Sequence, residues 1–115
     1  MKQEAYRMSL LLDYYGGLLT EKQRTYFDFY YNQDYSLGEI AEQEGISRQG
    51  VHDAINRTET TLREIEQTLG CVARETRLRQ RLREISQAVQ ALQASSEPAV
   101  QEAARRILLL TAEEF

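Results

Sequence analysis

The stretch DYSLGEIAEQEGISRQGVHDAINR, residues 34–57, decides the fold. Two short helical patterns meet in it at a glycine, and a serine precedes each pattern. Ser36 stands three residues before Glu39, which is the spacing of a capping box at the start of a helix. Gly45 ends this helix, because the turn that follows needs a residue that tolerates positive φ. Ser47 caps the next helix.

The spacing of the apolar residues in this stretch is typical of a helix-turn-helix. The second helix is predicted to run from Arg48 to about Leu69. A small residue, Ala41, stands where the two helices must cross, and Ile46 follows the turn glycine. The inward-facing positions are Leu37, Ile40, Val51 and Ile55. The same pattern would also serve a helix pair that only packs or contacts protein.

The exposed face of the second helix carries the candidate nucleic-acid-binding residues. Arginine and glutamine near a helix N-terminus can form bidentate hydrogen bonds with guanine and adenine edges. A serine cap also leaves backbone N–H groups that can bind a phosphate. We therefore expect DNA or RNA to contact Ser47, Arg48, Gln49, His52, Asp53, Asn56 and Arg57.

The charge distribution opposes tight duplex binding. The 115 residues carry a formal net charge of −4. Residues 36–70, which contain the helix-turn-helix pattern, hold three Lys/Arg against seven Asp/Glu. Because nucleic acid is a polyanion, this acidic excess favours weak binding. It also leaves open a protein-interaction module, in which the acidic face docks a basic partner.

Two further helices are predicted before this stretch. The first covers residues 4–15 and stops at Gly16-Gly17. Thr20, with Gln23 three residues later, begins the second. That helix carries an aromatic run: Tyr26, Phe27, Phe29, Tyr30 and Tyr31. Such a run can stack unpaired RNA bases, although rings at helical spacing more often form a core.

The composition changes beyond Gly70. Apolar residues recur there at steps of four and three, which is a heptad stripe: Leu78, Leu82, Ile85, Val89 and Leu92. A polar segment interrupts the stripe, and a last helix is expected from Pro98 to about Glu113. That helix is expected to bury Val100, Ala104, Ile107 and Leu108.

The short connection between these two helices implies an antiparallel hairpin over residues 71–115, after a core over residues 1–70. Since leucine-striped helices commonly self-associate, we expect the hairpin to form a homodimer. The hairpin also holds the arginine-rich segment Arg74–Arg83. These arginines can neutralise phosphates, or they can form a solvated face that pairs with Glu75 and Glu84.

Neither catalysis nor a bound cofactor is indicated. The single histidine and the single cysteine, His52 and Cys71, lie nineteen positions apart on different helices, which suggests no nucleophile–base pair. We find no Gly-rich phosphate loop and no metal-ligand spacing, so we expect no enzyme. A single cysteine fits a protein that stays in a reducing compartment. The sequence does not begin with the charged segment and following apolar segment of a signal peptide. The longest apolar run, residues 107–110, is too short to span a bilayer. A soluble, cytoplasmic protein is expected.

Three motifs together resemble a known family. They are LLTEKQR (residues 18–24), DYSLGEIAE (34–42) and SRQ-V-D-I-RTE (47–59). They resemble the YlxM family of small bacterial helix-turn-helix proteins, over residues 10–66. The same stretch is similar to region 4 of bacterial sigma factors, which reads a promoter element.

The resemblance implies a function as well as a fold. YlxM proteins are encoded beside the signal recognition particle GTPase and implicated in that targeting pathway. A nucleic-acid-binding regulatory protein accessory to this pathway is therefore implied, with the GTPase or its RNA as a partner. Two positions differ: Gly50 replaces the family's usual alanine and His52 its usual tyrosine. The predicted fold is all-α, a sigma-region-4-like helix-turn-helix core followed by a C-terminal helical hairpin.

Overall fold

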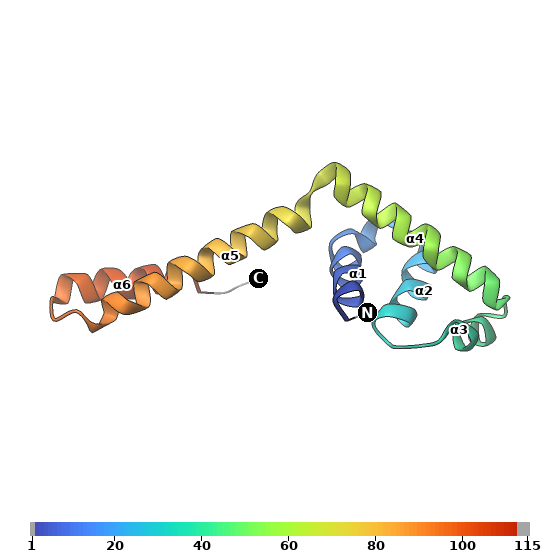
Figure 1. Ribbon diagram of the computed structural model, residues 1–115, viewed down its shortest axis with the longest axis horizontal. Coiled ribbons are helices and arrows are strands. Elements are labelled where there is room, and N and C mark those ends of the chain that lie inside the picture. Colours follow the sequence, from blue (N-terminus) through green and yellow to red (C-terminus); the bar gives the residue numbers. More distant parts are fainter. Residues whose placement is uncertain (1, 113–115) are drawn as a thin grey trace. The chain divides into compact units, whose positions relative to one another are not determined.

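The computed structural model describes residues 2–112 (Figure 1). Its elements, in chain order, are α1 Lys2–Tyr15, the 3-10 turn η1 Gly16–Leu18, α2 Glu21–Tyr31, α3 Leu37–Glu44, α4 Arg48–Leu69, α5 Cys71–Gln90, the 3-10 turn η2 Ala91–Ala94 and α6 Pro98–Leu110. Within this range there is no strand, so the predicted all-α class is confirmed. The chain forms two compact units, of which the first ends at Val72 and the second begins at Ala73.

The helix boundaries of the first unit follow the capping residues predicted from the sequence. The Thr20 hydroxyl accepts a hydrogen bond from the Gln23 backbone N–H at 3.2 Å, and the Gln23 side chain accepts one from the Thr20 N–H at 2.9 Å. Ser36 and Glu39 form the same reciprocal pair, with both distances 3.0 Å. Gly45 has φ +70°, in the left-handed region. These caps satisfy backbone groups that a helix end leaves unpaired, and the predictions are confirmed.

The core of the first unit is built by α1, α2, α3 and α4 together. Figure 1 shows the three shorter helices along one side of α4. One stripe of α4 turns inward at steps of four, three and four: Val51, Ile55, Thr58 and Leu62. The largest fully buried side chains of the other helices are Met8, Leu11, Phe27 and Ile40. Burial of such side chains contributes about 1.5–3 kcal/mol each, so tertiary packing holds α4 in place.

The aromatic run of α2 belongs to this core. Tyr26 and Phe27 are buried, and the Phe27 ring centroid lies 4.6 Å from that of Tyr31. Phe29 stacks at 4.9 Å on Tyr35, in the connector that follows α2. The interpretation of the run as a packing surface therefore fits the structure better than a row of rings open to RNA bases.

The second unit is a helical hairpin with a small core. Figure 1 shows α6 folded back along α5. In the part of this unit that the structure describes, Val89 and Ala104 are the buried hydrophobic side chains. The Ser86 hydroxyl, on α5, donates a hydrogen bond to the hydroxyl of Thr111, which follows α6, at 2.7 Å and so links the two helices of the hairpin.

The expectation that α6 buries four apolar side chains is wrong for three of them. Val100, Ile107 and Leu108 are only partly buried, whereas Ala104 is buried. A two-helix hairpin offers each helix one neighbour, which is too little to cover a whole apolar face. Pro98 occupies the first turn as predicted, but α6 ends at Leu110 with Thr111 as its C-cap, so the predicted end at about Glu113 is too late.

Candidate nucleic-acid interface

The turn between α3 and α4 sets how α4 begins. The backbone N–H groups of Gly45 and Ile46 both donate to the Ala41 carbonyl, at 2.9 and 3.2 Å. Ser47 then returns to extended backbone, and its hydroxyl accepts a hydrogen bond from the Gly50 N–H at 2.9 Å. The tight turn and the cap together place the first turn of α4 at the surface of the unit.

All seven predicted site residues are exposed in the structure, on the Ser47 cap and around the first half of α4. They are Ser47, Arg48, Gln49, His52, Asp53, Asn56 and Arg57, and each is exposed. The opposite face of the same turns holds the buried residues Val51 and Ile55. The helical period separates the two sets, because residues three and four apart share a face. This arrangement gives the first half of α4 an open polar surface.

A shallow hollow adjoins this face. It has a volume of about 430 Å³ and is lined by Leu37 of α3 and by Arg48, Gln49 and His52 of α4. The apolar Leu37 side chain therefore lies at the edge of the polar face. An apolar group beside Arg and Gln is the combination that can contact a thymine methyl and a neighbouring base edge.

Side chains on the face hydrogen-bond to one another. The Gln49 amide donates to the Asp53 carboxylate at 2.9 Å, and the His52 Nδ1 atom lies 3.7 Å from the same carboxylate oxygen. The Asn56 amide nitrogen is 3.4 Å from the His52 Nε2 atom. Before Gln49 can bind a base edge it must leave Asp53, at a net loss of about 0.5–1.5 kcal/mol.

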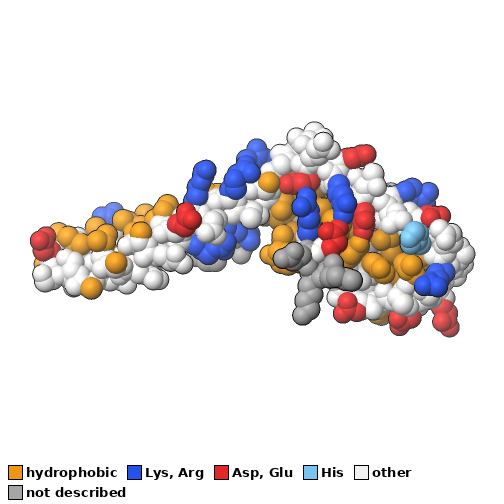
Figure 2. All heavy atoms as spheres, in the orientation of Figure 1, with side chains coloured by type: hydrophobic (Ala, Val, Ile, Leu, Met, Phe, Trp, Pro, Cys, Tyr) orange, Lys and Arg blue, Asp and Glu red, His pale blue; other side chains and the backbone are white. Residues whose placement is uncertain are grey.

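The electrostatics of the site are mixed. Arg48 and Arg57 are nine residues apart, which separates their Cα atoms by about 13.5 Å along the helix axis. Nine residues are also about two and a half turns, so the two side chains leave α4 on opposite sides, and Asp53 lies between them in the sequence. The preceding helix, α3, carries exposed Glu39, Glu42 and Glu44 and no Lys or Arg. Figure 2 shows Asp and Glu side chains interspersed with Lys and Arg over the first unit.

The capping geometry keeps one of these glutamates ionised. Hydrogen bonds from the Ser36 backbone and side chain hold the pKa of Glu39 below its ordinary value. The carboxylate is a fixed negative charge in the first turn of α3, where the helix dipole favours it. The first helix of a helix-turn-helix normally crosses the phosphate backbone, so this charge opposes nucleic-acid binding.

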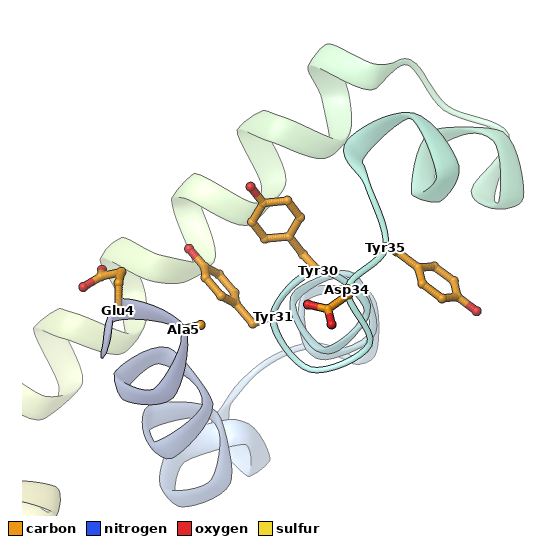
Figure 3. A pocket seen from close by; sticks show the side chains of 6 residues that line it. All are labelled: Glu4, Ala5, Tyr30, Tyr31, Asp34 and Tyr35. Carbon is orange, nitrogen blue, oxygen red and sulfur yellow. The ribbon is translucent and has the colours of Figure 1, made fainter. Parts of the chain in front are cut away.

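A second hollow, which the sequence did not reveal, lies at the end of α2. It has a volume of about 420 Å³ and is lined by Glu4, Ala5, Tyr30, Tyr31, Asp34 and Tyr35 (Figure 3). The Tyr31 hydroxyl donates to the Glu59 carboxylate, and Glu4 pairs with Arg63. Burial raises the pKa of Glu59, and the nearby Arg63 opposes that rise. These pairs join α1 and α2 to α4, so the walls of the hollow brace the fold.

The comparison with known proteins decides the family. Residues 2–102 match the sequence pattern of UPF0122, described as "Putative helix-turn-helix protein, YlxM / p13 like". The chain belongs to the UPF0122 family. The YlxM resemblance predicted from three motifs is thereby confirmed, and it extends beyond residue 66 into the hairpin.

Several UPF0122 proteins are similar to this chain. One from Halalkalibacterium halodurans is 46% identical over 97 residues, which cover 84% of this chain and 88% of that protein. One from Geobacillus kaustophilus is 51% identical over 80 residues, or 70% and 73% of the two chains. One from Desulforamulus reducens is 50% identical over 72 residues, or 63% of this chain and 62% of that protein, which is less than two thirds of its length. Within residues 2–112, no helix has the length and apolarity needed to cross a bilayer.

Proposed function

We propose that this UPF0122 protein is a non-enzymatic, nucleic-acid-binding regulatory protein that contacts its ligand with the first half of α4. The observation that carries the proposal is the exposed polar surface that follows the Ser47 cap and presents Arg48, Gln49, Asn56 and Arg57. Its position on the second helix of a helix-turn-helix is the position from which such proteins read base edges. The proposed binding surface comprises Ser47, Arg48, Gln49, His52, Asp53, Asn56 and Arg57.

Two ligands are favoured by the family resemblance. The link of YlxM proteins to the signal recognition particle makes the RNA of that particle the first candidate, and we place the protein in this pathway, in the cytoplasm. The likeness of the core to sigma region 4 makes duplex DNA the second candidate. We further propose that the hairpin over residues 71–115 joins two copies of the chain, because the core over residues 1–70 already buries its own apolar face.

A second candidate function is a protein-interaction module that docks the targeting GTPase without binding nucleic acid. The three exposed glutamates of α3 and Asp53 on α4 favour it, since they attract a basic protein surface and repel phosphate. In this case the same face of α4 would bind protein, and the hydrogen bond from Gln49 to Asp53 would remain intact.

A gel-shift panel of the full chain separates the two functions. The panel contains duplex DNA, the particle's RNA and, in a parallel pull-down, the purified GTPase. We expect a shift with nucleic acid at low salt that weakens steeply as salt rises, and that Arg48→Ala reduces. Lys22→Ala, which removes an exposed positive charge from α2, is the matched control. The nucleic-acid function fails if no shift occurs at low salt while Arg48→Ala weakens capture of the GTPase.

A further inference from the structure

The first half of α5 is a strongly basic segment in an acidic chain. Residues 73–83 carry five arginines and one glutamate, whereas the other 104 residues carry nine Lys/Arg and seventeen Asp/Glu. Figure 2 shows Lys and Arg side chains gathered over this part of the second unit. The positive charge of the chain is therefore concentrated outside the helix-turn-helix, whose residues 36–70 have an acidic excess.

Three of these arginines form one row along α5. Arg74, Arg77 and Arg81 follow one another at steps of three and four, which keeps their side chains within about one sixth of a turn. All three are exposed. The side of α5 that packs on α6, marked by Ser86 and the buried Val89, lies about a third of a turn away. The arginine row is therefore not covered by α6 and can meet a ligand.

The glutamates of α5 neutralise little of this row. Glu75 pairs at 3.3 Å with Arg79, which lies outside the row, and Glu84 accepts a hydrogen bond from a neighbouring glutamine at 3.4 Å. Among residues 2–112, no Asp or Glu forms an ion pair with Arg77 or Arg81. Like charges three and four residues apart destabilise a helix, and a solvated helix face normally mixes the two signs. A bound polyanion would relieve this repulsion.

A nucleic-acid backbone matches the row in charge and in spacing. The row covers seven residues of helix, or about 10 Å. One strand of a duplex carries a phosphate about every 3.4 Å along the axis, so the row spans about three phosphates. All five basic residues of the segment are arginines, and the planar guanidinium binds phosphate through two parallel hydrogen bonds. A regular row of one charge favours a ligand whose opposite charges are also regularly spaced.

We infer that Arg74, Arg77 and Arg81 form a second nucleic-acid contact, which binds the phosphate backbone without reading its sequence. The inference rests on the proposed function for its ligand, but it assigns a separate surface on the second unit. The arginine row supplies the salt-dependent, sequence-independent part of the affinity, and the first half of α4 supplies the preference for a sequence. This division explains how a chain with an acidic helix-turn-helix can bind a polyanion.

Salt titrations of the full chain test the row. Arg77→Gln/Arg81→Gln removes two charges that pair with no acidic residue in the described part of the chain, so its melting temperature should not fall. We expect its binding to duplex DNA and to the particle's RNA to weaken several-fold at low salt, equally on every sequence. The slope of log affinity against log salt should flatten by about 1.4–1.8, which corresponds to two phosphate contacts. Arg7→Gln/Lys22→Gln, which removes two exposed charges from the first unit, is the matched control and should leave the slope unchanged.

The outcomes separate this inference from the α4 proposal. An unchanged slope in the double variant, with binding that Arg48→Ala still reduces, would overturn the arginine row and leave α4 as the binding surface. A flattened slope in the double variant, with no effect of Arg48→Ala, would support the row and overturn the α4 surface. Absence of any shift at low salt would overturn both. Binding to phosphatidylserine vesicles that the double variant loses, while its nucleic-acid titrations stay unchanged, would overturn the inference and assign the row to an anionic membrane surface.

Discussion

The Tyr15 hydroxyl, at the end of α1, donates a hydrogen bond to the Glu66 carboxylate near the end of α4. The same hydroxyl accepts a hydrogen bond from the Cys71 backbone N–H at 3.1 Å, and the Glu66 carboxylate also accepts one from the Val72 N–H at 3.1 Å. These bonds cross the break between α4 and α5, where Gly70 takes the left-handed conformation with φ +65°. They hold the first residues of α5 against the core of the first unit.

Tyr15→Phe should therefore destabilise the first unit. The substitution keeps the buried ring but removes two hydrogen bonds, one of them to a carboxylate, at a cost of about 1–3 kcal/mol in the free energy of unfolding. Chemical denaturation monitored by circular dichroism would measure it. Tyr6→Phe is the matched control, because the Tyr6 side chain is 68% exposed, and it should leave the unfolding free energy unchanged. Equal stability of the two variants would show that the Tyr15 hydroxyl adds nothing.

The same group predicts a loss of stability at alkaline pH. Burial, followed by the hydrogen bond to Glu66 and the interaction with the Cys71 side chain, raises the pKa of Tyr15 to about 12 from an ordinary value near 10, and the hydrogen bond from the Cys71 backbone N–H opposes that rise. Because the folded state holds the Tyr15 proton more tightly than the unfolded state, the neutral hydroxyl contributes its full stabilisation of the fold below about pH 10. This contribution is lost as the pH rises toward 12, since the unfolded chain ionises first. Unfolding measured across this window should show a steeper decline for the natural chain than for Tyr15→Phe. Parallel pH profiles would contradict the assignment to Tyr15.

Gly50→Ala tests the start of α4. Gly50 has ordinary negative φ in the first turn, so alanine should stabilise the helix by up to about 1 kcal/mol. A Cβ atom there would lie 3.1 Å from the Ser47 hydroxyl oxygen, which must shift slightly. We therefore expect a gain of about 0.5 kcal/mol in the natural chain and the larger gain in a Ser47→Ala background. Thermal melts of the natural chain, Gly50→Ala, Ser47→Ala and the double variant would measure both gains in stability. Identical gains in the two backgrounds would exclude a steric contact between the new Cβ atom and the Ser47 hydroxyl.

Arg48 and Arg57 should differ in how they contribute to nucleic-acid binding. Arg48 lies in the first turn of α4, nearest the base edges, so Arg48→Ala should cost about 1–3 kcal/mol on the preferred sequence and less on others. Arg57→Ala should weaken all sequences alike and flatten the salt dependence by about one phosphate contact. Binding titrations at several salt concentrations measure both effects. Equal losses on every sequence for both variants would show that Arg48 contacts only phosphate.

Asp53→Asn should strengthen nucleic-acid binding. It removes a negative charge between the two arginines and replaces the acceptor that holds the Gln49 amide at 2.9 Å. The expected gain is a few-fold at low salt, since an exposed charge in water contributes about 1 kcal/mol or less. Glu64→Gln, which removes an exposed charge further along α4, is the control. Unchanged nucleic-acid binding together with weaker capture of the GTPase would contradict this prediction and favour the protein-interaction module.

Much of the first unit could be predicted because its determinants are local. A capping pair such as Thr20 and Gln23 spans three residues, and the turn at Gly45 depends on the conformation of one. The exposed face of α4 follows from the same helical period that turns Val51 and Ile55 inward. The hydrogen bond from Gln49 to Asp53 is also local, since it joins positions four apart, but the sequence alone does not select it among the partners available at that spacing.

The sequence by itself determined the capping residues of α2, α3 and α4 and which side of α4 is buried, because backbone conformation and the helical period act over a few residues. Only the tertiary structure decided that Tyr15 meets Glu66, 51 positions away, and that Tyr31 meets Glu59. It also decided that Leu78, Ile85 and Leu92 stay half exposed in the hairpin although their spacing is that of a buried stripe. Contacts between distant segments depend on how all the helices pack against one another, and the free energy of the whole fold selects that packing.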